Sequence, residues 1–409
     1  MAGPLAGYRV LDMSRILAGP WAGQMLADLG ADVIKIERPT FGDDTRSWGP
    51  PYLKDSRGKD TEDAAYFFCA NRGKKSVTVD ITCAEGQEII RQLAERSDVL
   101  IENYKVGGLA NYGLDYESLS KINPKLVYCS ITGFGQTGPY ANLPGYDFLI
   151  QGMGGLMSVT GEPDNPEKES GGPTKVGVAV TDLFTGLYAS NAIQAALIER
   201  QSSNIGQYID LALLDVQTAT LANQASNYLV GGVVPERLGN AHPNIVPYQA
   251  FPTSDGHIIV AVGNDQQFGR LCGALGEDEL ANDERFTTNA TRVNNRKLLC
   301  DVIKQNLKEH GSAHWLERLK LYDVPCGPIN TIDQVFEDPQ VVAREMVVSA
   351  PETRSGAVSM VGNPIKYGRS TSENALAPQQ LGESTDQVLR DYLEYSSTKI
   401  SALRDKSVI

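Results

Sequence analysis

An aspartate interrupts a run of small and apolar residues in the stretch GVAVTDLFTGLYAS, residues 177–190. Beyond Asp182, apolar residues recur at helical spacing, which predicts a helix to about Glu199. One explanation is helix capping, because Thr181 or Asp182 could satisfy free backbone N–H groups at a helix start. The other is chemical. A carboxylate in a dry pocket, held ionised by the helix dipole, can act as a covalent nucleophile.

Basic residues gather near the ends of predicted strands. Arg38 closes one strand, while Arg72, Lys74 and Lys75 precede another. Segments ENYKVGG and GFGQTGPYANLPGYD follow two more. Loops after the carboxyl ends of parallel strands are where α/β sheets bind ligands. These charges therefore favour an anionic ligand, although solvated turns would explain any one cluster alone.

The elements that must position these residues alternate over the first 230 residues. Strands are predicted at 8–14, 32–38, 76–81, 98–104 and 125–133, and helices at 23–30, 84–97 and 115–123. A strand at 207–215 runs into a long helix through residue 229. This rhythm predicts an α/β fold with a mostly parallel sheet covered on both faces.

The pattern changes near Gly231, where turns and short strands precede a helical block at about 265–322. We predict a large α/β domain at 1–230, a small domain at 231–323 and a return segment at 324–409. The return segment completes the large domain with short strands and a final helix at 385–395.

Composition excludes several classes of protein. The 409 residues carry a net charge of −13, which argues against a nucleic-acid partner because such a surface needs a basic face. The six scattered cysteines, without a CxxC pair, predict reduced buried thiols. No apolar run approaches the ~20 residues of a membrane span, so no membrane partner is expected.

Ordinary cofactor motifs are absent from the sequence. LAGPWAGQ replaces GxGxxG after the first strand, and neither GxxxxGK[ST] nor GxSxG occurs. His310 and His314 are four residues apart, but Gly311 stands where a zinc protease has Glu. We therefore expect no metal and no permanently bound cofactor.

Taken together, the segments resemble the class III CoA-transferases, the family of formyl-CoA and carnitine CoA-transferases. The resemblance rests on PLAGYRVLDMSRILAGPWAGQMLADLGADVIKIERP, GDDTR, NRGKKSVTVDI, ENY, SITGFGQTGPYANLPGYD, GVAVTDLFTGLYA, GNAHPNIVPYQAFPTSDGHIIVAVGND, VPCGPINTIDQVFEDPQV and LGESTDQVL. IVPYQAF followed by GNDQQF is most like the succinyl-CoA:glutarate branch, which handles dicarboxylic acids.

The resemblance implies an interlocked homodimer, each chain having a large Rossmann-like domain and a smaller α+β domain. It makes Asp182 the catalytic residue, which forms aspartyl anhydrides and an aspartyl–CoA thioester. The implied reaction moves CoA from succinyl-CoA, or a similar donor, to a dicarboxylate such as glutarate or itaconate. The expected location is the mitochondrial matrix, with the cytoplasm as the alternative, although no presequence is visible.

The resemblance also assigns binding residues by motif position. For CoA these are Leu17, Ala18, Arg38, Val79, Asp80, Ile81, Asn103, Tyr104, Gly145, Tyr146 and Asp147. For the far carboxylate of the acceptor they are Arg46, His242, Asn244, Tyr248 and Gln249. Structural explanations stay open, because Val79 and Ile81 suit a strand core and His242 suits a structural loop. Lys105 and Val106 replace the Arg-Pro pair of many relatives, which puts one phosphate contact in doubt.

Two other functions fit parts of the pattern. Acyl-CoA racemases share this fold but remove an α-proton with an Asp/His pair, and residues 110–160 contain no histidine. A non-catalytic CoA-binding protein is the second alternative, and the intact Asp182 speaks against it.

Overall fold

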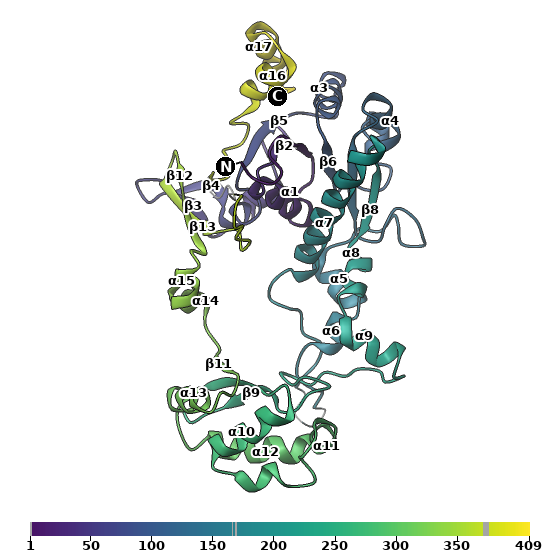
Figure 1. Cartoon of the computed structure of the whole chain (residues 1–409). Helices are drawn as coiled ribbons and strands as arrows, with labels where there is room; N and C mark the ends of the chain where they lie inside the picture. The colour runs from purple at the N-terminus through teal and green to yellow at the C-terminus, as the bar shows by residue number, and fades with distance from the viewer. Residues whose placement is uncertain (1, 166, 168–169, 371–375) are drawn as a thin grey trace. The chain divides into compact units, whose positions relative to one another are not determined.

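The computed structural model describes residues 2–165, 167, 170–370 and 376–409. Its main feature is a six-stranded parallel sheet in the order β5-β2-β1-β6-β7-β8 (Figure 1). The strands are β1 (Arg9–Asp12), β2 (Asp32–Glu37), β5 (Lys74–Thr78), β6 (Val99–Glu102), β7 (Val127–Thr132) and β8 (Tyr208–Ala212). In chain order this is the Rossmann arrangement, whose ligand crevice lies where the strand order reverses, between β1 and β6.

Helices cover both faces of this sheet. On one face they are α1 (Ala18–Asp28) and α7 (Val180–Ser203). On the other they are α3 (Ala84–Glu95), α4 (Tyr116–Ile122), α16 (Thr385–Leu393) and α17 (Ser397–Asp405). Leu26 and Ile193 pack with Val33 in one buried cluster, and Ile90 and Leu389 belong to the opposite cluster. Strands buried on both faces explain the nearly continuous Val/Ile/Leu runs that made them recognisable in the sequence.

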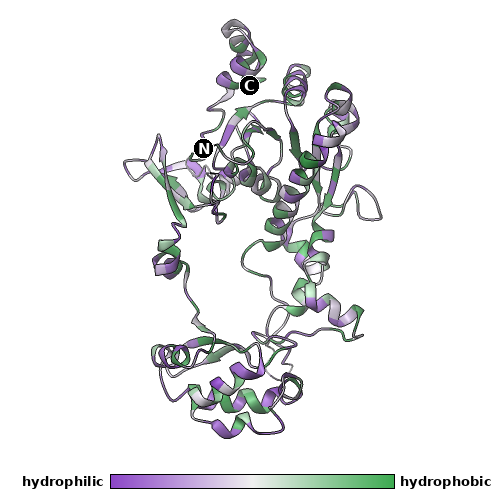
Figure 2. Ribbon diagram, viewed as in Figure 1, coloured by the Kyte–Doolittle hydropathy of each residue, from purple (hydrophilic) through white to green (hydrophobic). Residues whose placement is uncertain are grey.

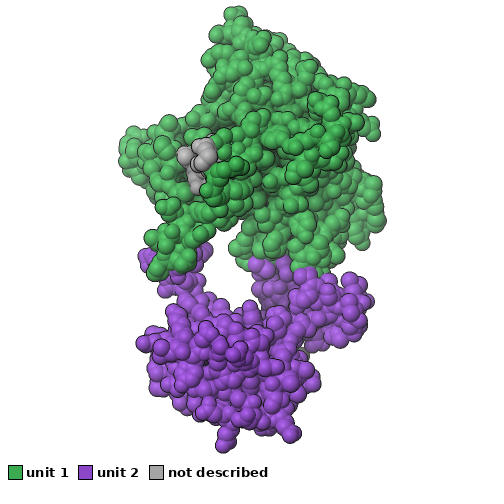
Figure 3. All heavy atoms as spheres, viewed as in Figure 1, with its two compact units in different colours: residues 1–154, 177–221, 339–409 green, residues 155–176, 222–338 purple. Residues whose placement is uncertain are grey.

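The chain forms two compact units, which Figure 3 colours separately. Residues 1–154, 177–221 and 339–409 form the first, and residues 155–176 and 222–338 form the second. The shorter elements of the first unit are η1 (Asp44–Ser47), β3 (Tyr52–Lys54), β4 (Asp60–Ala64), α2 (Ala65–Phe68), η2 (Leu109–Tyr112), α5 (Asp147–Met153), α8 (Leu213–Ala219), α15 (Pro339–Ala343), β12 (Val347–Glu352) and β13 (Gly356–Val361).

The second unit is built on a three-stranded antiparallel sheet in the order β11-β10-β9. Its elements are α6 (Leu156–Val159), α9 (Ala222–Leu229), β9 (Tyr248–Pro252), β10 (His257–Ala261), α10 (Asp265–Leu275), η3 (Asp278–Ala281), α11 (Asn289–Asn294), α12 (Arg296–Leu307), α13 (Ser312–Leu321), β11 (Cys326–Pro328) and α14 (Ile332–Glu337). Helices α10 and α12 mix apolar and polar residues (Figure 2), and Phe251, Phe268 and Trp315 lie in their shared core. The predicted fold class, a Rossmann-like unit plus a smaller α+β unit, is therefore confirmed.

Several predicted boundaries differ from the structure. The long helix through residue 229 is two helices, because Ala222 has a φ of 47°, which interrupts helical geometry. The second unit consists of residues 155–176 and 222–338, whereas the small domain predicted from the sequence begins at 231. The second unit continues to Asp338 because β11, placed in the return segment, pairs with β10. The helix predicted at 385–395 is not the last, since Ser396 caps a further helix, α17.

Candidate active site

The loop between β1 and α1 is held at the point where the strand order reverses. Asn103, directly after β6, accepts from the Arg15 N–H at 2.9 Å and donates to the Arg15 carbonyl at 2.8 Å. The Asp12 carboxylate accepts from the Ser14 N–H at 3.0 Å, and the Lys35 ammonium donates to the Ser14 carbonyl at 3.0 Å. Asn103, predicted to contact CoA, therefore fixes the backbone of the crevice loop.

A buried cluster of lysine and aspartate side chains contacts the backbone of this loop. Lys35 pairs with Asp43 at 2.8 Å, and Lys74 pairs with Asp12 at 2.8 Å. Burial is the largest single influence and disfavours the charged Asp43, but the charge and hydrogen bond of Lys35 and the two hydrogen bonds from Thr45 together lower the Asp43 pKa to about 2. Burial lowers the pKa of Lys74 to about 8 despite the opposing charge of Asp12. Asp43 also accepts from the N–H of Ile16, which has an unfavourable φ of 73°, so the cluster maintains a strained loop.

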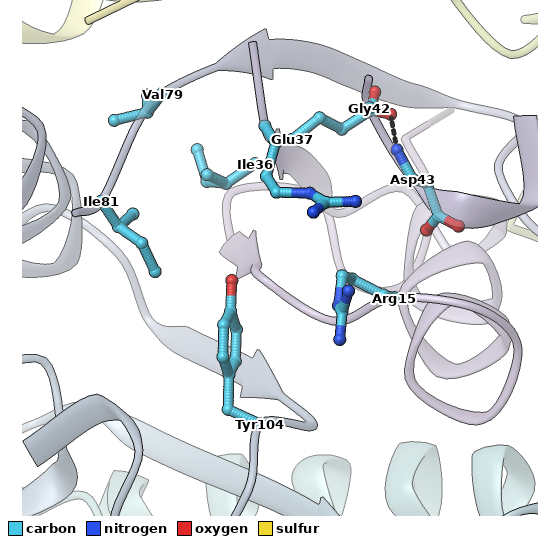
Figure 4. A pocket seen from close by; sticks show the side chains of 9 residues that line it. Arg15, Ile36, Glu37, Gly42, Asp43, Val79, Ile81 and Tyr104 are labelled. Carbon is cyan, nitrogen blue, oxygen red and sulfur yellow. Dashed lines mark hydrogen bonds between the residues drawn. The ribbon is translucent and has the colours of Figure 1, made fainter. Parts of the chain in front are cut away.

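A pocket in the first unit collects four of the predicted CoA-binding residues (Figure 4). It is lined by Arg15, Ile36, Glu37, Arg38, Gly42, Asp43, Val79, Ile81 and Tyr104. Arg15 and Arg38 reach the two oxygens of Asp44, at 2.9 and 3.1 Å, and both side chains stay partly exposed. Two arginines beside a tyrosine ring and apolar walls can accept a phosphorylated ligand. Sequence analysis missed Arg15, although it follows the first strand much as Arg38 follows the second.

The half-buried Asp182 is the third residue of α7 and lies in its first turn rather than at its N-cap. The N-cap position is Ala179, whose side chain cannot accept a hydrogen bond. Asp147, the first residue of α5, takes over this role. Its Oδ1 accepts from the Thr181 N–H at 2.9 Å and from the Asp182 N–H at 3.3 Å. Another residue thus does the capping, which leaves the Asp182 carboxyl available for chemistry.

The electrostatics of Asp182 differ from the expected ionised carboxylate. Burial, followed by the negative charge of Asp147, raises the Asp182 pKa to about 7. Tyr66 on α2 interacts electrostatically with both carboxyls, and burial raises its pKa to about 12, so it is protonated at neutral pH. Near neutral pH the carboxyl can therefore lose its proton and become an unusually basic nucleophile.

The start of α1, which contains the predicted Leu17 and Ala18, lies beside α7. A Cβ on Gly186 would lie 2.8 Å from the Ala18 carbonyl oxygen and 2.9 Å from Trp21. Only glycine permits this approach, one turn beyond Asp182. Leu17 and Ala18 are both buried, and Leu17 occupies the N-cap position of α1.

The remaining CoA predictions fall on three kinds of position. Gly145 packs directly on Gly133, where a Cβ on either glycine would overlap the other's Cα. Tyr146 is exposed at the start of α5. Asp80 follows β5 and accepts from the Thr82 N–H at 2.9 Å, so it shapes the turn after the strand.

Arg46, predicted to bind the acceptor, lies in a buried ion-pair network instead. Its Nε and Nη2 donate to Glu37 at 2.8 Å, and its Nη1 donates to Asp63 at 2.8 Å. Its guanidinium also lies 3.7 Å from the centre of the Phe67 ring. These contacts give Arg46 a structural role, and its contact with the acceptor stays a prediction. Sequence alone could not show that Glu37 and Asp63 converge on it.

The other predicted acceptor residues lie in the second unit. The His242 N–H donates to the Tyr248 carbonyl at 3.0 Å, and His242 Nδ1 accepts from the Asn244 N–H at 3.1 Å. Gln249 follows Tyr248 on β9. Arg296 adds a cation that sequence analysis missed, with Nη2 donating to the His242 carbonyl at 2.8 Å. Within the described part of the chain, its buried Nη1 has no hydrogen-bond partner.

Within the described ranges, no helix is long and apolar enough to cross a membrane. The same residues contain no group of three or more His, Cys, Asp or Glu side chains placed to hold a metal ion.

The fold and site together define a Rossmann-type α/β protein with a carboxyl of raised pKa on a helix that packs against the first helix of the crevice. The chain belongs to CoA-transferase family III, whose family model matches residues 5–385. A succinate–glutarate CoA-transferase of Agrobacterium fabrum (strain C58) is 52% identical over 388 residues, covering 95% of each chain. Human succinyl-CoA:glutarate CoA-transferase is 42% identical over 99% of this chain and 90% of its own.

Solved structures agree with this assignment. A CAIB/BAIF family protein from Brucella suis has a TM-score of 0.83 and 50% identity, covering 96% of this chain and all of its own. A hypothetical protein from Mycobacterium tuberculosis has a TM-score of 0.81 and 28% identity, covering 94% of this chain and 99% of its own.

Proposed function

We propose that this protein transfers CoA from succinyl-CoA to glutarate, with Asp182 as the covalent nucleophile. The observation that carries the proposal is the Asp182 carboxyl, placed beside α1 at the start of α7, where Asp147 accepts from the backbone N–H groups and leaves this carboxyl out of the capping. The relatives named above, whose names specify succinate or succinyl-CoA together with glutarate, support the choice of substrates. Itaconate is a second acceptor to test, because it is also a short dicarboxylate.

The proposed mechanism proceeds through two anhydrides and one thioester. An Asp182 oxygen attacks the succinyl-CoA carbonyl carbon, the C–S bond breaks, and CoA leaves as a thiolate. The thiolate then attacks the aspartyl carbonyl, which releases succinate and leaves an aspartyl–CoA thioester. A glutarate carboxylate attacks this thioester and displaces the thiolate, which attacks the glutaryl carbonyl of the new anhydride. Glutaryl-CoA forms and the Asp182 carboxylate is regenerated, so covalent catalysis replaces one hard exchange with easier steps.

For CoA, we propose that the pocket around Arg15 and Arg38 holds phosphate groups. Both guanidiniums already share the carboxylate of Asp44, which an incoming phosphate can replace as their partner. Val79, Ile81 and Tyr104 supply apolar walls in the same pocket. CoA is a substrate in this scheme and not a resident cofactor.

For the acceptor, we propose that His242, Asn244, Tyr248 and Gln249 recognise the far carboxylate, assisted by Arg296. Replacing Arg296 with Gln should raise the KM for glutarate about tenfold or more, because a charge-assisted hydrogen bond is lost. Butyrate, which lacks the second carboxylate, should be affected much less. Arg285→Gln is the matched control, since Arg285 is paired with Asp283 on the surface of the same unit. An unchanged glutarate KM would remove Arg296 from the acceptor site.

Two further features belong to the same proposal. The interlocked homodimer stays a prediction, and the apolar side chains exposed on α5 and α7 support a covering partner, among them Phe148, Phe184 and Tyr188. The mitochondrial matrix also stays a prediction for location.

The direct test is an exchange assay. Purified protein is incubated with succinyl-CoA and glutarate, itaconate, oxalate or carnitine, and acyl-CoA products are separated by liquid chromatography and mass spectrometry. We expect glutaryl-CoA and free succinate in equal amounts. If the protein binds CoA but converts none of these acceptors, the proposed reaction is contradicted.

A further inference from the structure

The carboxylate of Asp147 lies at an unusual place for a negative charge. It is buried, with 8% of its surface exposed, and accepts hydrogen bonds from the backbone of the helix that carries the nucleophile. Its second oxygen accepts from Gln151 Nε2 at 2.7 Å. Three N–H donors thus stabilise its charge and fix its orientation.

The surroundings of the two carboxyls contain little to offset their repulsion. From α2, Tyr66 interacts with both but is neutral at physiological pH. From α8, the neutral Gln217 accepts from the Thr181 hydroxyl at 2.6 Å. From α1, the close neighbour of α7 is Trp21, which does not titrate. Asp147 is thus the charged group that acts on the Asp182 carboxyl among the described residues that influence it.

We propose that Asp147 is a positioning residue for the transfer reaction: it fixes the first turn of α7, and its negative charge keeps the Asp182 carboxylate reactive. This inference rests on the proposed function and adds a role beyond the CoA contact expected from the motif. Its physical basis is that two nearby negative charges repel each other. When Asp182 attacks the thioester, its negative charge passes to the thioester carbonyl oxygen and then leaves with the CoA thiolate, so the repulsion between Asp147 and the Asp182 oxygens weakens as the covalent bond forms. The charge of Asp147 therefore favours acylation over the resting carboxylate.

The sharpest variant is Asp147→Asn. An Asn side-chain oxygen can still accept from the Thr181 and Asp182 N–H groups, while the charge is removed. In wild type, the rate of exchange under kcat/KM conditions should rise with pH through about 7, the Asp182 pKa. We call this rise in rate the acid limb of the pH profile. In Asp147→Asn the acid limb should move to lower pH by about one unit or more. The plateau rate above it should fall, because a less basic carboxylate attacks the thioester more slowly.

Asp210→Asn is the matched control. Asp210 also accepts a backbone hydrogen bond, from the Gln136 N–H at 3.1 Å, but does not contribute to the Asp182 pKa. Its acid limb should coincide with that of wild type. An acid limb that stays at the wild-type position in Asp147→Asn, with the variant folded and active, would overturn the proposal. A purely structural cap would change the rate without moving the acid limb.

A second variant covers the case in which Asp147→Asn does not fold. Asp147→Ser also removes the charge, while its hydroxyl oxygen can accept from the Thr181 and Asp182 N–H groups. A rise in rate at lower pH than in wild type would support the role of Asp147, and a rise at the wild-type pH would overturn it. Failure of the proposed function has a separate signature, because wild type would then show no exchange at any pH.

Discussion

Two groups of buried carboxylates in the first unit have opposite electrostatics. Beneath the crevice loop, Asp12 and Asp43 are each paired with a lysine, and the Asp43 pKa falls to about 2. At the start of α7, Asp182 faces another carboxylate and its pKa rises to about 7. The residue type is the same, so the presence or absence of a facing cation decides the difference. The paired carboxylates maintain the structure, and the unpaired one can perform chemistry.

The largest expected effect comes from removing the unpaired carboxylate. Asp182→Asn cannot form an anhydride, so exchange of CoA between succinate and glutarate should fall about a thousandfold or more. Steady-state rates measure this, with CoA binding by calorimetry as the control for an intact pocket. Substantial exchange in Asp182→Asn would show that the unpaired carboxylate is not the group that performs the chemistry.

Removing one member of a buried carboxylate–lysine pair should instead lower the free energy of unfolding. Asp43→Ala leaves Lys35 buried without its partner and should lower the free energy of unfolding by about 3–5 kcal/mol. Urea denaturation at neutral pH measures the loss. The control is Asp60→Ala, since Asp60 pairs with Lys54 on the surface and should cost about 0–1 kcal/mol. Equal losses in the two variants would contradict the structural role of the buried cluster.

The Asp182 carboxylate, which has no facing cation among the described residues, should reduce the stability of the folded protein at pH values at which it is ionised. The folded pKa of Asp182 lies above its unfolded value, so its contribution is greatest in acid and is lost as pH rises toward 7. Asp182→Asn should therefore be more stable than wild type at pH 8, by about 2 kcal/mol after allowance for partial solvent screening. The gap should narrow toward pH 4. A gap that is constant with pH would mean that the Asp182 pKa is ordinary.

Glu102 is a third kind of buried carboxyl, because among the described residues it is paired neither with a lysine, as Asp43 is, nor with a second carboxylate, as Asp182 is. Burial raises its pKa to about 7, although hydrogen bonds from Ser130 and the Tyr104 N–H oppose the shift. Glu102→Gln retains an acceptor for these donors and should gain about 1 kcal/mol at pH 8 and less at pH 5. Thermal unfolding at both pH values measures the difference. A loss of stability at pH 8 would show that Glu102 forms stronger charged interactions than its surroundings indicate.

The sequence was sufficient for much of the fold. Runs such as DVIKIER and SVTVDI predicted strands β2 and β5, since β-branched residues in short apolar runs suit a sheet buried on both faces. The helical spacing after Asp182 predicted α7, and Arg38, Val79, Ile81 and Tyr104 do line one pocket. These features depend on local patterns or on the ends of strands.

The contacts that tune the site could not be predicted because they join residues distant in the chain. Asn103 holds Arg15 across 88 positions, and Asp147 caps Thr181 across 34. The ion pairs of Arg46 could not be predicted either, because its carboxylate partners Glu37 and Asp63 belong to two different strands. Charge alone does not distinguish an arginine that is fully paired from one that is available to a ligand.

The central claim is that Asp182 forms a covalent bond with the acyl donor. Wild type and Asp182→Asn would be incubated with succinyl-CoA and then hydroxylamine, and peptide masses would locate any hydroxamate. We expect a hydroxamate on Asp182 in wild type, formed by capture of the aspartyl anhydride or thioester, and none at this position in Asp182→Asn. A wild-type protein that exchanges CoA with Asp182 unmodified, or with the hydroxamate on another carboxyl, would contradict the account.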